Sequence, residues 1–148
     1  MRIASHFTNY ISRTFHVCIL HHHHLQRLKS SNLQQAVKEA LLKVDRNNYS
    51  TNTASSYMDG PQYIGYGQII SVPCMHAHAM EEILPILLQF SQTQPNLKIL
   101  DVGCGSGYLT AALGRLVDRN GPVRPLAPGK VFGIEFVPEL VDLSLKIS

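Results

Sequence analysis

The residues best suited to chemistry form a glycine-rich turn, Gly103-Cys104-Gly105-Ser106-Gly107. The turn follows Lys98–Val102, an apolar run that predicts a buried strand, and it precedes a segment with helical spacing. Glycines at the carboxyl end of a strand tolerate positive φ and let the backbone approach a ligand closely. The helix behind them offers unpaired N–H groups to that ligand. The sequence therefore predicts a ligand site at this turn.

Two acidic residues narrow the choice of ligand. Asp101 precedes the glycines, and Glu135 is at the end of a second strand-like run, Lys130–Phe136. A carboxylate at Asp101 repels a pyrophosphate but suits a ligand with an ammonium group, as in S-adenosylmethionine. Glu135 at the next strand tip is placed to accept hydrogen bonds from both ribose hydroxyls of an adenosine ligand. An NAD-type ligand and a tight turn that binds nothing remain as alternatives.

The elements around the turn must hold these residues in place. The helix behind the glycines is indicated by apolar residues at helical spacing, and Pro138 suits the first turn of a last helix. Strand, glycine turn, helix and strand make a βαβ unit, and its right-handed crossover makes the two strands parallel. The fold class predicted is therefore α/β. The apolar positions of the middle helix are Leu109, Ala112, Leu113, Leu116 and Val117.

Two helices and a short strand are predicted upstream of this unit. Apolar spacing indicates a helix over residues 33–44 and a second helix over about His76–Phe90, with Pro85 either kinking it or starting another helix. Between them, Gln68–Val72 is typical of a short strand, and Pro73 ends it. The residues of the second helix expected to face a core are Ala77, Met80, Leu84, Leu87 and Leu88.

Length and composition set the class of protein. The chain has 148 residues, of which 45% are hydrophobic and 16% charged, which is typical of one soluble globular domain. No apolar run is long enough for a transmembrane helix, so no membrane association is expected. The net charge of +3 is too small to predict nucleic-acid binding. Because the first 38 residues hold five basic side chains and no acid, the remainder carries a net −2.

The basic stretch at residues 1–30 predicts a disordered leader, and residues 31–148 form the expected domain. The leader's basic, serine-containing composition also resembles a mitochondrial transit peptide, although a cytoplasmic location is the main expectation. Its histidine tract, residues 21–24, is expected to be solvated and to hold no metal.

The cysteines and the second histidine pair also predict no metal site and no disulfide framework. The three cysteines, at positions 18, 74 and 104, are too few and too scattered for either. His76 and His78 are two residues apart, so they face away from each other on a helix.

Five segments in a fixed order are shared with a known family. They are 45–49 (DRNNY), 57–62 (YMDGPQ), 64–73 (IGYGQIISVP), 75–77 (MHA) and 100–110 (LDVGCGSGYLT). Together they resemble the protein-L-isoaspartate (D-aspartate) O-methyltransferase family over residues 33–148. The resemblance implies a Rossmann-like, S-adenosylmethionine-dependent methyltransferase fold. It also implies a monomer that transfers methyl groups to the free carboxylate of L-isoaspartyl residues in damaged proteins and peptides.

The resemblance also assigns roles to individual residues. Ser71 matches the family's active-site serine, although by itself it is more typical of a serine at a strand end. His76, which alone would pass as a residue at a helix start, falls in the segment that closes over the cofactor. The residues carried over for cofactor binding are Gln68, Ile69, Ile70, Ser71, His76, Asp101, Gly103, Ser106, Gly107 and Glu135.

The chain departs from the family pattern at both ends. Residues 1–30 do not resemble the family's first helix, and the chain stops after the second strand and its helix. An incomplete sheet is therefore expected, with an exposed edge. This leaves an alternative function: a truncated, non-catalytic product that binds at most a cofactor or a partner. The residues expected along the exposed edge are Ile99, Leu100, Val131 and Ile134.

Overall fold

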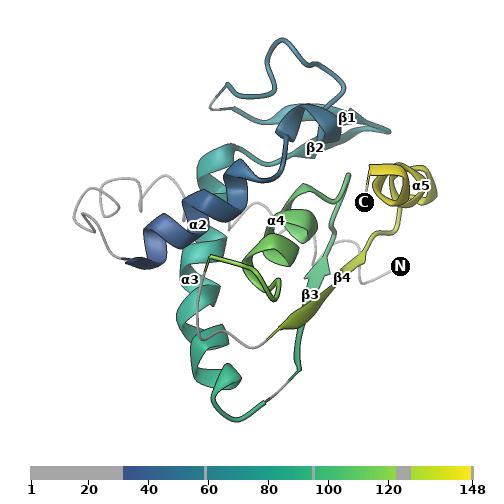
Figure 1. The fold of residues 1–148 in the computed structure, drawn as a ribbon. Helices are drawn as coiled ribbons and strands as arrows, with labels where there is room; N and C mark the ends of the chain where they lie inside the picture. The colour runs from purple at the N-terminus through teal and green to yellow at the C-terminus, as the bar shows by residue number, and fades with distance from the viewer. Residues whose placement is uncertain (1–31, 59, 95, 123–127, 148) are drawn as a thin grey trace. The chain divides into compact units, whose positions relative to one another are not determined.

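The computed structural model describes residues 32–58, 60–94, 96–122 and 128–147, and the side chains from Gln35 onward. All of them belong to one unit, residues 32–148. The predicted leader, its histidine tract and Cys18 lie outside the described residues. Figure 1 shows the elements in the order α2 (Asn32–Leu42), η1 (Arg46–Tyr49), β1 (Gln62–Gly65), β2 (Gln68–Ile70), α3 (Pro73–Ser91), β3 (Leu97–Val102), α4 (Tyr108–Leu116), β4 (Gly129–Ile134) and α5 (Pro138–Ile147).

The predicted βαβ unit is present. Strands β3 and β4 are parallel, with Leu97 opposite Gly129 and Val102 opposite Ile134. Helix α4 connects them and packs against β4. Beyond the ladder, the amides of Gly103 and Cys104 both donate to the Ile134 carbonyl, at 2.7 and 3.1 Å. The start of the glycine turn is therefore fixed to the end of β4.

The strand predicted at Gln68–Val72 is shorter than expected and belongs to a hairpin. It ends at Ile70 and pairs antiparallel with β1, with Tyr63 opposite Ile69. The connecting residues Gly65, Tyr66 and Gly67 all have positive φ. Glycine supplies this conformation without steric cost, whereas a tyrosine there is strained. The turn brings the chain back so that the segment after β2 runs into α3.

Helix α3 is a single helix with Pro85 inside it, so the alternative of two helices is wrong. It begins at Pro73, because a proline in the first helical turn loses no hydrogen bond. His76 therefore lies within the helix rather than at its start. Of the predicted core residues, Met80, Leu84 and Leu87 are buried, whereas Ala77 and Leu88 are partly buried against the core.

The two faces of the β3–β4 sheet differ sharply. Ile99 is 5% exposed and Val131 packs against the core, whereas Leu100 is 57% and Ile134 52% exposed. The expectation that all four would be exposed along an edge is wrong for Ile99 and Val131. Successive residues of a strand point to opposite faces, so the apolar exposure lies on one face instead. Val102 and Phe132 extend that exposed face.

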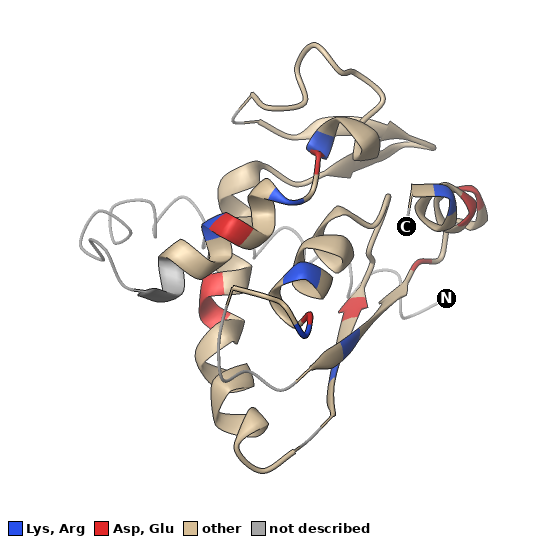
Figure 2. Ribbon diagram, viewed as in Figure 1, with Lys and Arg blue, Asp and Glu red and all other residues tan. Residues whose placement is uncertain are grey.

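Charged residues do not gather on one element. Figure 2 shows both signs distributed along the described elements, on helices and strands alike. Within the described residues, no helix has the length and apolar character needed to cross a membrane.

Candidate functional site

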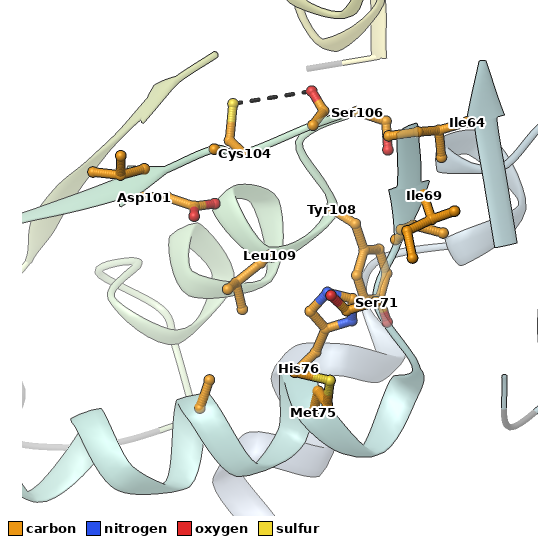
Figure 3. A pocket seen from close by; sticks show the side chains of 15 residues that line it. Ile64, Ile69, Ser71, Met75, His76, Asp101, Cys104, Ser106, Tyr108 and Leu109 are labelled. Carbon is orange, nitrogen blue, oxygen red and sulfur yellow. Dashed lines mark hydrogen bonds between the residues drawn. The ribbon is translucent and has the colours of Figure 1, made fainter. Parts of the chain in front are cut away.

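A cavity of about 230 Å³ lies between the hairpin, helix α3 and the glycine turn. Residues 69–71 line it from the hairpin and the segment that follows, His76 lines it from α3, and residues 101–106 line it from the turn. Figure 3 shows Ser71 and His76 on one side of this space and Asp101 and Cys104 on another. Segments about 30 residues apart in the chain therefore share one cavity.

Most of the residues predicted for the site line this cavity, and the others lie directly beside it. Gln68 precedes Ile69 in β2, Gly107 precedes helix α4, and Glu135 is hydrogen-bonded to the turn. The predicted residues that line the cavity are Ile69, Ile70, Ser71, His76, Asp101, Gly103 and Ser106.

The glycine turn has the backbone conformation that its composition predicts. Gly103, Gly105 and Gly107 all have positive φ, at 78°, 58° and 92°. A Cβ on Gly103 would meet nothing within 4 Å, so the space above this residue is open to a ligand. Ser106 is 1% exposed, and its hydroxyl donates to the Tyr49 carbonyl at 2.8 Å. The serine therefore ties the turn to η1.

Asp101 lies near the end of β3 with its carboxylate partly buried. Its Oδ2 accepts a hydrogen bond from the Thr110 hydroxyl at 2.6 Å. Burial raises the pKa of this carboxyl, and the negative charge of Glu135 raises it further. A cationic group in the cavity would relieve both effects. The site is therefore suited to an ammonium or sulfonium group.

Glu135 follows β4 and braces the glycine turn. Its Oε2 accepts from the Gly105 amide at 2.8 Å, and its Oε1 accepts from the amides of Phe136 at 2.8 Å and Val137 at 3.0 Å. In the sheet register, Asp101 lies opposite Gly133, two residues before Glu135. The two carboxylates thus lie at neighbouring strand ends, as the sequence predicted. The ribose-binding role of Glu135 stays a prediction.

Glu135→Ala is expected to weaken binding of S-adenosylhomocysteine by about 1–3 kcal/mol, or roughly 5- to 150-fold. The substitution removes a charged acceptor from three backbone amides, so the turn loses its brace as well as its carboxylate. Isothermal titration calorimetry measures the change. Glu82→Ala, which removes an exposed carboxylate from α3, is the matched control. An unchanged dissociation constant would remove Glu135 from ligand binding.

The structure also places a buried arginine behind the cavity, which the sequence reasoning missed. Arg46 is 1% exposed. Its Nε donates to the Ser56 carbonyl at 2.7 Å and its Nη2 to the Ser71 carbonyl at 2.6 Å. Its Nη1 lies 3.3 Å from Nδ1 of His76, and its Cζ lies 5.1 Å from the centre of the Tyr108 ring. Arginine is almost never fully buried unless it has partners, so residue type alone gave no signal.

His76 forms the other polar wall of the cavity and is neutral at physiological pH. Burial lowers the pKa of its imidazole to about 4, and the charge of Arg46 contributes to this shift. The ring also packs against the Tyr108 ring, with 5.0 Å between centroids. A general base near pH 7 needs a pKa closer to that pH, so this imidazole is suited to donating a hydrogen bond.

The cavity fits part of an adenosyl ligand. It combines open backbone at Gly103, a carboxylate at Asp101 and apolar side chains at Ile64, Met75 and Leu109. Its volume is below the range of about 300–1,000 Å³ that is usual for ligand pockets, so such a ligand would extend beyond it. Among the residues that the structure describes, no cluster of three His, Cys, Asp or Glu side chains could hold a metal ion.

Comparisons with known proteins agree on one family. Residues 20–147 match the family model described as protein-L-isoaspartate(D-aspartate) O-methyltransferase. Protein-L-isoaspartate O-methyltransferase 1 of Arabidopsis thaliana is 38% identical over 110 residues, which cover 74% of this chain and 42% of that protein. The Caenorhabditis elegans protein-L-isoaspartate O-methyltransferase is 39% identical over 112 residues, covering 76% and 43%. The chain thus spans about two fifths of the length of these relatives.

Solved structures show the same fold. A Plasmodium falciparum protein described as a protein-L-isoaspartate O-methyltransferase, in complex with S-adenosyl-L-homocysteine, aligns with a TM-score of 0.60 and 31% identity. The alignment covers 84% of this chain and 51% of that one. The α/β unit described above is therefore an incomplete Rossmann-like methyltransferase fold. Since the family model matches most of its residues, the chain belongs to the protein-L-isoaspartate(D-aspartate) O-methyltransferase family.

Proposed function

We propose that the cavity at the glycine turn binds S-adenosylmethionine and that the complete protein methylates the free α-carboxylate of L-isoaspartyl residues in damaged proteins and peptides. One observation carries the proposal. The glycine turn with Asp101, assigned to the cofactor, and the Ser71–His76 segment, assigned in part to the acceptor, line a single cavity. A methyl donor and a methyl acceptor bound to these two segments would therefore be adjacent. The cytoplasmic location and the monomeric state stay predictions.

On the cofactor side, the chain's own residues bind S-adenosylmethionine and orient it. The Asp101 carboxylate is placed to offset a positive charge, and Glu135 keeps the Gly105 region of the turn in shape. The backbone at Gly103 leaves room for close approach. When bound, S-adenosylmethionine supplies a methyl group that its sulfonium already activates.

On the acceptor side, the site needs little acid–base chemistry. A carboxylate is a nucleophile at neutral pH, so no strong general base has to deprotonate it. The Ser71 hydroxyl and a neutral His76 are suited to donating hydrogen bonds that hold the carboxylate in place. The main task is to align oxygen, methyl carbon and sulfur, and positioning of this kind lowers barriers by roughly 7–11 kcal/mol at its best.

A methyl-transfer assay tests the proposal. The complete protein, with any in-frame continuation that its transcript encodes after Ser148, is incubated with tritiated S-adenosylmethionine and an isoaspartyl peptide. The aspartyl peptide of the same sequence is the control. Label is expected in the isoaspartyl peptide alone. Equal labelling of both peptides would contradict the repair function and indicate a broader carboxyl methyltransferase.

One substitution connects this activity to the cavity. Ser71→Ala is expected to reduce transfer by about fivefold, because it removes one hydrogen-bond donor of about 1 kcal/mol from the acceptor side. Ser91→Ala, at the far end of α3, is the control. Full activity of Ser71→Ala would remove the serine from the reaction.

A second candidate function concerns the 148 residues by themselves. The exposed apolar face of β3 and β4 favours it, because a fragment with such a face would bind a cofactor weakly and pair with other surfaces. In this candidate function, the 148-residue polypeptide binds a cofactor or a partner but does not catalyse methyl transfer. It predicts that the 148-residue chain binds S-adenosylhomocysteine yet transfers no methyl group. Methyl transfer by this chain alone would contradict it.

A further inference from the structure

Arg46 connects three separate parts of the cavity wall from behind. It does not line the cavity itself, but Ser71, His76 and Tyr108 do, and the guanidinium contacts all three. Its fourth contact, to the Ser56 carbonyl, fixes it to the loop before β1. An arginine side chain has a planar, rigid fork of donors, so these contacts define one orientation for each partner.

Every described partner of this guanidinium is uncharged. They are two backbone carbonyls, a neutral imidazole and the Tyr108 side chain, which contacts the guanidinium through its ring and its hydroxyl. Burial disfavours the charge and lowers the pKa of the guanidinium, yet an arginine stays protonated in proteins. The positive charge is therefore retained behind the cavity wall at Ser71. An anionic group bound at Ser71 would be stabilised by it.

The contact with His76 also determines where the imidazole proton lies. Arginine has only donors, so Nδ1 of His76 must accept in the 3.3 Å contact with Nη1. The proton of the neutral ring is then on Nε2. This leaves one N–H donor on a side chain that lines the cavity.

We infer that Arg46 is the positioning residue of the acceptor side: it anchors the main chain at Ser71 and keeps the His76 proton on Nε2. The serine hydroxyl and the imidazole N–H then meet the acceptor carboxylate in a fixed geometry. The inference rests on the proposed function for the identity of that carboxylate. The state of the His76 ring does not depend on it.

Two variants separate positioning from folding. Arg46→Met keeps much of the apolar volume and removes both the charge and the donors. Arg46→Lys keeps the charge but loses the planar fork that bridges two carbonyls and the imidazole. The control is Arg119→Met, which removes an exposed positive charge. The His76 signals are assigned by comparison with His76→Gln.

The first readout is the ¹⁵N spectrum of the His76 ring in the 148-residue chain. The unmodified protein is expected to show the Nε2–H tautomer, and Arg46→Met a mixture of both tautomers. Arg46→Lys is expected to retain Nε2–H in part, and Arg119→Met fully. A His76 tautomer that is identical in all four proteins would overturn the inference.

The second readout is kinetic and uses the complete protein. Arg46→Met is expected to lower kcat/KM for the isoaspartyl peptide by about 10²-fold, the effect of a misplacement of roughly 1 Å. The dissociation constant of S-adenosylhomocysteine is expected to change less than about threefold, since Asp101, Gly103 and Glu135, the residues proposed to hold the cofactor, are not partners of Arg46. Equal losses for peptide and cofactor would indicate a general structural role and overturn the inference. If the unmodified protein methylates no isoaspartyl peptide, the proposed function fails, whereas the tautomer still decides the role of Arg46.

Discussion

Gly105→Val is expected to reduce the affinity for S-adenosylhomocysteine by more than about 100-fold. Gly105 has a φ of 58°, and β-branched residues in this conformation are genuine outliers. A Cβ at this position would also lie 3.1 Å from Cδ1 of Ile64, and its methyl groups would enter the cavity. Backbone strain of about 1–2 kcal/mol and the lost volume together account for the effect. Calorimetry with S-adenosylhomocysteine measures it.

Gly114→Ala is the matched control for this substitution. Gly114 lies in helix α4, and a Cβ there would meet nothing within 4 Å. An alanine in a helix interior is more stable than a glycine by roughly 0.5–1 kcal/mol, so this variant should be slightly stabilised and bind normally. If Gly105→Val bound as tightly as Gly114→Ala, the turn would not be the ligand site.

Acidification from pH 7 to pH 4 is expected to lower the free energy of unfolding by on the order of 3 kcal/mol through His76 alone. The folded-state pKa of this histidine is about 4, against 6.5 for the ordinary side chain. Between these two values the unfolded chain binds a proton that the folded chain excludes. The contribution of His76 to the free energy of unfolding is therefore complete above about pH 6.5 and is lost as the pH falls toward 4. Urea unfolding at a series of pH values measures it.

His76→Gln isolates this contribution, because glutamine keeps a hydrogen-bond acceptor for Arg46 but does not titrate. Asp101 changes the free energy of unfolding in the opposite direction. Its pKa is raised in the folded protein by burial, so its contribution grows as the pH falls. Subtracting the free energy of unfolding of His76→Gln from that of the unmodified protein at each pH cancels the contribution of Asp101 and of every other group that the two proteins share. Parallel pH profiles for the two proteins would contradict a neutral, buried His76.

The βαβ unit could be predicted from the sequence because local patterns determine it. The apolar run Lys98–Val102, the glycines and the helical spacing after them each predict one element, and the handedness rule makes the strands parallel. The placement of Asp101 and Glu135 at neighbouring strand ends follows from that topology. Hence the part of the candidate site formed by residues 101–107 and Glu135 could be located from residue types alone.

The other side of the site depends on long-range contacts that leave no local pattern. The β1–β2 hairpin is held by pairing across Gly65-Tyr66-Gly67, where a strained tyrosine takes a position usual for glycine. The burial of Arg46 depends on carbonyls 10 and 25 residues further along the chain. The exposure of Leu100 and Ile134 was predicted, but that of Ile99 and Val131 was not found. Successive side chains of a strand point to opposite faces of the sheet, so one strand has both buried and exposed apolar residues.

The most direct test of the central claim is an NMR titration of the ¹⁵N-labelled 148-residue chain with S-adenosylhomocysteine. The amide signals of Gly103 and Gly105 are expected to shift saturably with that of Ser71, because all three residues line the cavity. The amide of Gly121, beyond the other end of α4, is expected to stay unchanged. Saturable shifts elsewhere with unchanged Gly103 and Gly105 signals, or no shifts at all, would contradict an adenosyl site at the glycine turn.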